Sequence, residues 1–420
     1  KMNFNVKGSR SVKLQINLRS TLAKLFLLTF AISRIIFFFN GTWSGYYGFY
    51  SMSPEVGPLD QYILACSSVL GVWFSILCFT DSLKHKKNRV STILFAFMLT
   101  FLFVLWTMDF LGKNSSTLLF VGNFTPLTLL FFGSFYAGSN TKLMASISYF
   151  AKYIAMIFLL LSLVYSVQFY VEYGSVGVRY GYSHALIYFE YGFYALMLYV
   201  CGYKEFKFSK NRKMLFMLVI LSVILAVMSV SRGWIIQSIA LLIYAYLGKE
   251  AGEKSYKSKN ATKAVTVIAV IGLIVVAIIQ FAPELVETLG GRLNQDTRSL
   301  QLIEFMTQMD IKKFVLGQGY NATYIESAHG TYAYIDNQML MMIFRYGLIP
   351  TVIYLRFVIS SALCFFKYRD GYGFAGVMWL LALNGLAIYL GFGIDIPNFC
   401  MMLIIGRGVA HYQMKGRNEG

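Results

Sequence analysis

The sequence predicts an all-α integral membrane protein of about twelve transmembrane helices with one large extracytoplasmic loop. Of its 420 residues, 57% are hydrophobic and only 13% are charged, whereas a soluble domain usually carries roughly 25% charged residues. Apolar stretches long enough to cross a hydrocarbon layer of about 30 Å recur along the chain. Basic residues collect in alternate connections between those stretches, as they do in multi-pass membrane proteins.

Twelve apolar stretches are the expected transmembrane helices: 21–39, 61–79, 91–111, 118–138, 143–169, 184–203, 214–230, 234–247, 264–282, 338–363, 373–394 and 398–411. The first follows a basic segment but lacks a small-x-small cleavage site, so we expect an uncleaved first helix. The chain then divides into helices 1–9 in residues 1–282, a cap loop in 283–337, and helices 10–12 with a cytoplasmic tail in 338–420.

The net charge of +18 is explained by basic residues placed on one side of a membrane. If the chain crosses the membrane at every stretch, alternate connections lie on the same side. The seven segments on the side of the N-terminus hold 24 of the 37 Lys and Arg residues: 1–19, 81–90, 139–142, 204–213, 248–263, 367–370 and 412–420. The short opposite loops hold only Lys113, Arg179 and Arg232. This positive-inside pattern predicts that both termini are cytoplasmic, and no nucleic-acid partner is needed to explain the charge.

The seventh and eighth stretches are separated only by Ser231-Arg232-Gly233. We interpret 214–247 as two short helices with Arg232 at the outer surface. A single helix would instead place Arg232 inside the membrane and move every later segment, the cap loop included, to the other side.

The loop from Pro283 to Asp336 differs in kind from the other connections, because it holds seven of the nineteen acidic residues and four basic ones. Function concentrates in loops that a rigid scaffold positions. Asp296-Thr297 fits the start of a helix over 298–309. One apolar face of that helix is expected to pack down onto the bundle: Leu300, Ile303, Phe305 and Met309. Gly317-Gln318-Gly319 then predicts a turn, so the loop is expected to form a small helical cap.

Three arginines on the outer side are candidate diphosphate-binding residues: Arg232, Arg292 and Arg298. A guanidinium offers a fixed fork of donors that matches phosphate oxygens, and it stays charged at any relevant pH. The alternatives are that Arg232 reaches toward lipid phosphates and that the other two are solvated loop charges.

His329 and Asp336 are the candidate catalytic residues, because each is an outer-side group that can accept a proton. Asn337 follows Asp336 directly, and Arg345 lies about two helical turns further on, where an intramembrane charge suggests function. We treat Asn337 and Arg345 as candidate substrate-binding residues. The alternative for His329 is a polar surface side chain.

Metal and cofactor sites are not expected. Asp296, Glu304 and Asp310 are spread along a helix without a D-x-D pattern, so metal-free chemistry is favoured. The cysteines have no CxxC spacing and read as buried apolar residues; they are Cys66, Cys78, Cys201, Cys364 and Cys400.

The order and spacing of motifs across 214–351 resemble the bacterial O-antigen polymerase and ligase family, the Wzy-type glycan polymerases. The motifs are Ser231-Arg232-Gly233, Gly291-Arg292, Leu316-Gly317-Gln318-Gly319, and Asp336-Asn337 followed after nine residues by Gly347-Leu348-Ile349-Pro350-Thr351. Ligases of this family carry His-Asn, nine residues, then Gly-x-x-Thr-Thr. Here Asp336 stands in place of that histidine and Pro350 in place of the first threonine, and the arginine-x10-glycine pattern of some polymerases is absent after Arg179 and Arg292.

The resemblance implies a GT-C-like bundle in the bacterial inner membrane that polymerises undecaprenyl-diphosphate-linked repeat units of an O-antigen or capsule. Donor and acceptor are both lipid-linked glycans, and a chain-length regulator is an implied partner. The candidate arginines would hold the diphosphate, while His329 or Asp336 would act on the acceptor hydroxyl. Two alternatives stay open: a ligase that transfers finished glycan to lipid A-core, and a flippase or transporter of lipid-linked sugar.

Overall fold

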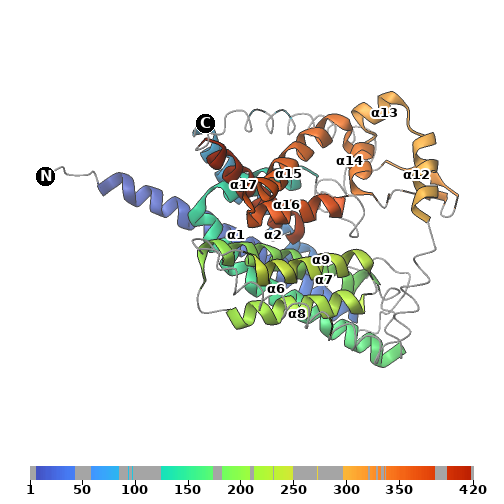
Figure 1. Ribbon diagram of the computed structural model, residues 1–420, viewed down its shortest axis with the longest axis horizontal. Helices are drawn as coiled ribbons and strands as arrows, with labels where there is room; N and C mark the ends of the chain where they lie inside the picture. Colours follow the sequence, from blue (N-terminus) through green and yellow to red (C-terminus); the bar gives the residue numbers. More distant parts are fainter. Residues whose placement is uncertain are drawn as a thin grey trace.

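The computed structural model describes residues 6–42, 58–84, 124–173, 182–208, 212–229, 231–248, 297–319, 322–327, 330–332, 335, 337–383 and 395–417, with the single residues 93, 97 and 272. Helices make up almost all of this part of the chain, as an all-α prediction requires (Figure 1). The predicted spans 91–111 and 264–282 lie outside it, apart from those single residues, so the count of twelve stays a prediction.

The main bundle contains the long helices: α1 (Val6–Thr42), α2 (Pro58–Lys84), α5 (Phe124–Ser139), α6 (Thr141–Tyr173), α7 (Tyr182–Phe206), α8 (Arg212–Met228), α9 (Arg232–Leu247), α15 (Leu348–Tyr368), α16 (Gly371–Leu381) and α17 (Ile396–Arg417). Within the described ranges, three helical segments are long and apolar enough to cross a membrane: Tyr62–Lys84, Thr141–Gln168 and Leu348–Tyr368. A bilayer core is spanned by about twenty helical residues, so each of these segments has sufficient length for a crossing.

Two central helices, α7 and α17, are buried along most of their length, including the run from Phe399 to Ile405. Glycines allow α17 to approach α5 closely. A Cβ at Gly406 would lie 1.9 Å from the carbonyl oxygen of Phe135, and one at Gly138 would lie 2.1 Å from that of Leu403. Small residues at helix contacts favour such packing within membranes.

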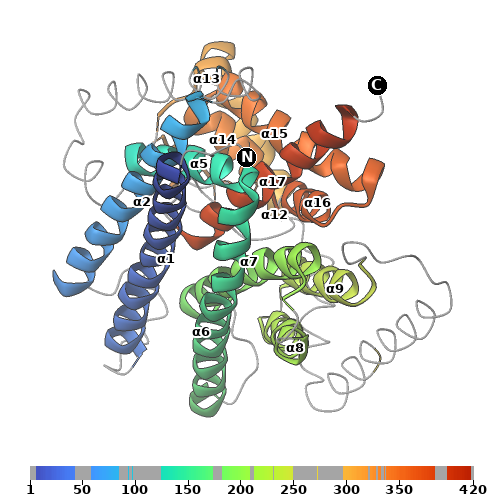
Figure 2. The ribbon, with the colours of Figure 1, turned by 90° about the vertical axis from the view of Figure 1, so that its left-hand side faces the viewer.

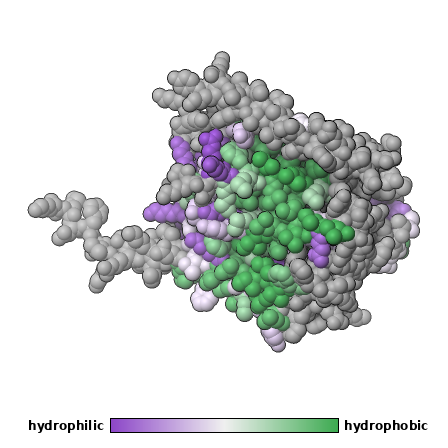
Figure 3. Space-filling view, turned by 90° about the horizontal axis from the view of Figure 1, so that it is seen from below, coloured by the Kyte–Doolittle hydropathy of each residue, from purple (hydrophilic) through white to green (hydrophobic). Residues whose placement is uncertain are grey.

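The outer helices expose apolar side chains, as lipid-facing helices do. On α2, Tyr62, Val69 and Trp73 are more than half exposed. Figure 3 shows a broad hydrophobic area on the described surface, with hydrophilic residues gathered mainly at its left-hand margin. Cys66 is exposed, so the prediction that all five cysteines are buried is wrong at this position, because Cys66 lies on the outward side of α2.

The break predicted between the seventh and eighth spans is confirmed. Helix α8 ends at Met228, Ser229 forms a turn, and α9 begins at Arg232. The two helices lie side by side in Figures 1 and 2, so they form a hairpin rather than one continuous helix.

The predicted span 338–363 is not one helix. It divides at Gly347 into α14 (Gln338–Tyr346) and α15, because Gly347 adopts a φ of +86° that interrupts helical geometry. The long apolar helix therefore starts at Leu348, and α14 is a separate short helix.

The cap contains α12 (Thr297–Thr307), α13 (Ile311–Leu316) and a short antiparallel pair formed by β1 (Tyr324–Glu326) and β2 (Gly330–Tyr332). Helix α12 starts at Thr297, next to the predicted cap Asp296-Thr297. Helices α12 and α13 lie on the right-hand side of Figure 1, away from the start of α1. Gly317 and Gly319 have positive φ angles after α13, which confirms the predicted turn.

The cap has a small core of its own, formed by Phe305, Ala322, Tyr324, Ile335, Met341 and Phe344. The Phe305 ring lies 5.6 Å from that of Tyr324 and 5.2 Å from that of Phe344. Of the residues predicted to pack inward, Phe305 is buried and Met309 packs against this core. Ile303 is 59% exposed, so its predicted inward packing is wrong: the buried face of α12 carries Gln301 and Phe305 instead.

Candidate functional site

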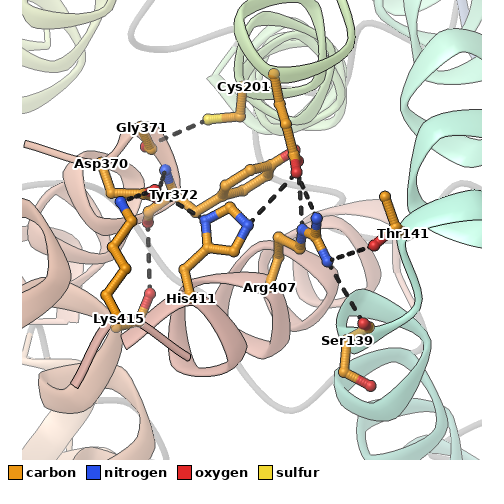
Figure 4. Close-up of polar contacts among 11 residues, drawn as sticks. Ser139, Thr141, Cys201, Asp370, Gly371, Tyr372, Arg407, His411 and Lys415 are labelled. Carbon is orange, nitrogen blue, oxygen red and sulfur yellow. Dashed lines mark hydrogen bonds and ion pairs between the residues drawn. The ribbon is translucent and has the colours of Figure 1, made fainter. Parts of the chain in front are cut away.

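The bundle has two distinct ends, and the first is defined by ionic contacts. Glu205 at the end of α7, Asp370 before α16, and Arg407 and His411 on α17 meet there (Figure 4). We call this the ion-pair end. Arg19 of α1 pairs with Asp81 of α2 at 2.7 Å close by.

Several basic segments predicted to share one side of the membrane meet at the ion-pair end. Ser20 Oγ of α1 lies 2.7 Å from Ser146 Oγ of α6, and Lys204 Nζ donates to the carbonyl oxygen of Gly248 at 2.8 Å. The segments beginning at 139, 204, 248 and 367 therefore lie together, as the charge pattern predicts.

The opposite end carries the cap, and we call it the cap end. Helix α9 finishes near Lys204 at the ion-pair end, so Arg232 at its start lies about 24 Å away by helical rise. Helix α15 finishes beside Asp370, so Leu348 at its start lies at the opposite end as well. Arg232 and the junction of α14 with α15 therefore share the cap end.

The cap is attached to α14 by backbone contacts. Gln318 N donates to the carbonyl oxygen of Phe344 at 2.8 Å, and Gly319 N donates to that of Arg345 at 3.0 Å. Gly317 approaches Gly347 so closely that a Cβ on Gly317 would lie 2.6 Å from the Gly347 nitrogen. The turn after α13 is thus fixed on the end of α14.

A second set of contacts holds the β-pair on α12. Gln308 Nε2 donates to the carbonyl oxygen of Ile325 at 2.7 Å, and Ile325 N donates to Gln308 Oε1 at 2.9 Å. Ser327 N donates to Glu304 Oε2 at 3.0 Å. These bonds make the cap an ordered unit.

The predicted site residues fall into two groups. Arg232 is the first residue of α9 and its side chain is exposed. Asn337 caps α14, and its Oδ1 accepts from Leu340 N at 3.2 Å. Arg345 is half-buried in the last turn of α14. The structure brings these three residues to the cap end, with Arg232 on α9 and both Asn337 and Arg345 on α14.

The remaining predicted residues are not placed. Arg298 lies in the first turn of α12, where only its backbone is described. Arg292, His329 and Asp336 lie outside the described residues. The choice between His329 and Asp336 as catalytic base therefore stays open.

Sequence reasoning did not find the network at the ion-pair end. Arg407 forms an ion pair with Glu205, and its Nη1 also donates to Thr141 Oγ1 at 3.1 Å. The Tyr372 hydroxyl donates to Glu205 at 2.7 Å, and His411 Nε2 lies 3.4 Å from the same carboxylate (Figure 4). The sequence did offer one signal: Arg407 is a charged residue within a predicted span, and the acidic residues Glu205 and Asp370 lie just beyond the ends of other spans.

Asp370 completes this network. Its Oδ2 lies 2.8 Å from His411 Nδ1 and 3.4 Å from Lys415 Nζ, and its Oδ1 accepts from Tyr372 N at 3.0 Å. One histidine thus bridges two carboxylates from different helices. The network joins α7, the α15–α16 turn and α17.

Hydrogen bonds decide the charge state of the two carboxyls. Burial raises the pKa of Glu205, but hydrogen bonds from His411, Arg407 and Tyr372 outweigh it and hold that pKa at about 2, below the ordinary 4.5. Burial likewise raises the pKa of Asp370. The hydrogen bond and charge of His411 and the charge of Lys415 outweigh this effect, so the pKa lies below its ordinary value. Both carboxyls are therefore anionic at neutral pH, and the network is a structural tie between helices.

Comparisons with known proteins add no further identification. The chain matches no protein-family model, no curated protein and no solved structure. The motifs within residues 214–351 and the arrangement of the cap end are the features that bear on function.

Proposed function

We propose that this chain is an integral-membrane glycosyltransferase that polymerises lipid-linked oligosaccharide repeat units on the outer face of the bacterial cytoplasmic membrane. Its donor is a growing glycan on undecaprenyl diphosphate, and its acceptor is one repeat unit on the same lipid. The ion-pair end faces the cytoplasm, in keeping with the basic segments gathered there. The cap end faces outward.

One observation supports this proposal most: an ordered cap is attached by backbone hydrogen bonds to the end of the bundle where α9 starts with Arg232. Transfer between two bound substrates needs groups held in fixed positions, because orientation lowers the barrier. A cap fixed on α14, at the same end of the bundle as Arg232, supplies such a frame.

The reaction is a single displacement at the donor's anomeric carbon. A hydroxyl oxygen of the acceptor's distal sugar forms a bond to that carbon while the bond from the carbon to the diphosphate oxygen breaks. The bonding electron pair leaves with the diphosphate, and the hydroxyl proton passes to His329 or Asp336. One displacement inverts the configuration at the anomeric carbon.

The arginines act on the leaving group. Arg232, Arg292 and Arg298 bind the diphosphate and stabilise the charge that develops as it departs. Asn337 and Arg345 contact the sugar or its linkage from α14. A chain-length regulator is a further proposed partner.

The test compares Arg232→Ala with Arg212→Ala. Each arginine is the exposed first residue of its helix, but Arg212 starts α8 at the opposite end. We expect Arg232→Ala to insert and fold but to form no long glycan in a host lacking the native gene, and Arg212→Ala to form normal glycan. Normal chain length in both variants would contradict the assignment of Arg232.

A transporter of lipid-linked sugar is a second candidate, because charged side chains are buried in the bundle. Lys152 is 3% exposed and Glu190 is 9% exposed, and buried charges in membrane helices often line transport paths. Glycolipid analysis of a host lacking the chain separates the candidates. Loss of a polymerase leaves single repeats on the final carrier, loss of a ligase leaves long lipid-linked polymer, and loss of a flippase traps repeats inside.

A further inference from the structure

Helix α13 of the cap lies at the height where a membrane-spanning helix begins. Gly347 is the residue directly before α15, and the α15 segment Leu348–Tyr368 is long and apolar enough to cross a membrane. Its 21 residues rise about 32 Å, close to the thickness of the hydrocarbon layer, so its start lies near the membrane surface. A Cβ on Gly347 would lie 2.4 Å from the carbonyl oxygen of Val315 in α13. Helix α13 is therefore held at the membrane surface.

Helix α13 also lies at a lateral margin of the bundle. Helices α8 and α9 run nearly horizontally across Figure 1, so the upper edge of that view is a side of the bundle. In Figures 1 and 2 alike, α13 lies at this upper edge, above α14 and α15. A helix at the rim of a membrane-spanning bundle, at the height of the membrane surface, has lipid headgroups beside it.

The solvent-facing side of α13 combines apolar and basic residues. Ile311 and Leu316 are both exposed, and so are Lys312 and Lys313. Successive residues of a helix are about 100° apart, so Lys312 projects between Ile311 and Leu316 on a face that spans roughly 140°. Amphipathic helices that lie in the membrane interface have this combination of apolar side chains and lysines.

The exposure of Ile311 is extreme. Its side chain is 85% exposed, and no other large hydrophobic side chain in the described ranges is more exposed. Most of the other strongly exposed apolar residues belong to the long bundle helices, where lipid covers them. The exposed side of α15 begins with Ile349 and Val352, and α13 packs against the start of that helix. The apolar side of α13 therefore continues a surface that faces lipid.

The two lysines of α13 differ in how far nearby groups compensate their charge. Lys313 Nζ lies 3.8 Å from the Asp310 carboxylate and 3.4 Å from the carbonyl oxygen of Gln308. Lys312 projects from the exposed face between Ile311 and Leu316. A lysine in such a position can lay its methylene groups along the apolar surface and place its ammonium group among lipid phosphates. Lys312 is therefore the main candidate for a contact with anionic lipid.

We propose that α13 is an interfacial helix that docks the cap on the surface of the bilayer. Ile311 and Leu316 insert among the upper parts of the lipid chains, and Lys312 binds the phosphate of an anionic phospholipid. The proposal goes beyond the glycan reaction, because a polymerase, a ligase and a transporter with this cap would all carry the same contact.

The cap is already ordered for this contact. Gln318 N and Gly319 N donate to carbonyl oxygens of α14, and Asp310 Oδ1 accepts from Lys313 N at 2.7 Å at the start of α13. A short free peptide would lose conformational entropy on reaching the membrane, whereas this helix is held in place by the bundle. A face with few residues can therefore bind lipid, because preorganisation removes most of that cost.

The test measures contact between α13 and lipid in the full chain. An NBD fluorophore is attached to Ile311→Cys in a Cys66→Ser background, because Cys66 is exposed and the other four cysteines are buried. The chain is placed in nanodiscs of phosphatidylcholine that include a nitroxide-labelled phosphatidylcholine, with or without phosphatidylglycerol. We expect the nitroxide lipid to quench the fluorophore when phosphatidylglycerol is present. In Lys312→Gln, the ratio of quenched to unquenched fluorophore should fall about fivefold, equivalent to about 1 kcal/mol.

Two controls match the position and the charge. Ile325→Cys carries the fluorophore on β1, where Ile325 is exposed and its backbone is bonded to Gln308 of α12; α12 lies on the far side of α14 from α15 in Figure 1. This fluorophore should not be quenched. Lys312→Arg should retain the quenching at position 311, and Lys313→Gln should reduce it less than Lys312→Gln does, because Asp310 already compensates Lys313.

Several outcomes would overturn the interfacial helix. Absence of lipid quenching at position 311, or equal quenching at positions 311 and 325, would show that α13 does not dock on the bilayer. Shielding of the fluorophore from aqueous iodide without lipid quenching would show that a protein covers this face instead. Quenching that Lys312→Gln leaves unchanged would exclude the phosphate contact. A fluorophore at Leu316→Cys gives an independent reading of the same face and should follow the result at position 311.

Discussion

Gly317 and Gly347 lie against each other with positive φ angles of +78° and +86°, and this contact joins the cap to the bundle. A Cβ on Gly347 would lie 2.4 Å from the carbonyl oxygen of Val315. The obstacle is backbone and cannot move aside as a flexible side chain would. The end of the α13 turn and the start of α15 are therefore held by one close approach.

Gly347→Ala should detach the cap. The positive φ alone costs roughly 1–2 kcal/mol for a residue with a Cβ, and the clash adds to it. Limited proteolysis should then cut within 297–332 much faster than in wild type. Gly330→Ala is the control, because Gly330 has a φ of +72° but nothing within 4 Å of an added Cβ. Equal proteolysis of both variants would show that the close approach does not matter.

Phe305→Ala should loosen the cap without unfolding the bundle. Removing a fully buried phenylalanine costs about 3–5 kcal/mol, and this side chain lies in the separate cap core. Hydrogen exchange should rise across α12 and the β-pair and stay unchanged in α7. Ile303→Ala, on the exposed side of the same helix, should change stability by less than about 0.5 kcal/mol.

Arg407→Leu should destabilise the bundle more than Arg407→Leu combined with Glu205→Leu. The single change leaves the Glu205 carboxylate without its guanidinium partner, and breaking a buried pair costs about 3–5 kcal/mol. The double change removes both charges. Thermal unfolding in detergent measures the difference, and equal melting temperatures for the two variants would show that the pair is not coupled.

Acid should weaken the ion-pair end. The pKa of Glu205 falls from an ordinary 4.5 to about 2 on folding, so the folded state binds fewer protons than the unfolded state between these values. The stabilisation is fully present above about pH 4.5 and is lost as the pH falls toward 2. Melting temperatures between pH 7 and pH 3 should decline less steeply for Glu205→Gln than for wild type. Parallel curves would exclude Glu205 as a source of the decline.

Sequence patterns alone predicted the helical class, the gathering of basic segments at one end, the break before Arg232 and the start of the cap helix next to Asp296-Thr297. Hydropathy and charge act through contact with lipid and water, and a glycine or a capping residue acts on its own neighbours. Each of these features can therefore be read from a short stretch of chain.

The division of the predicted span 338–363 and the pairing of charges became known from the packed fold. Glu205 and Arg407 are 202 residues apart, so no local pattern links them. Gly347 takes its positive φ where Gly317 packs against it. These features depend on which distant segments pack together, and that is fixed by the fit of side chains across helices.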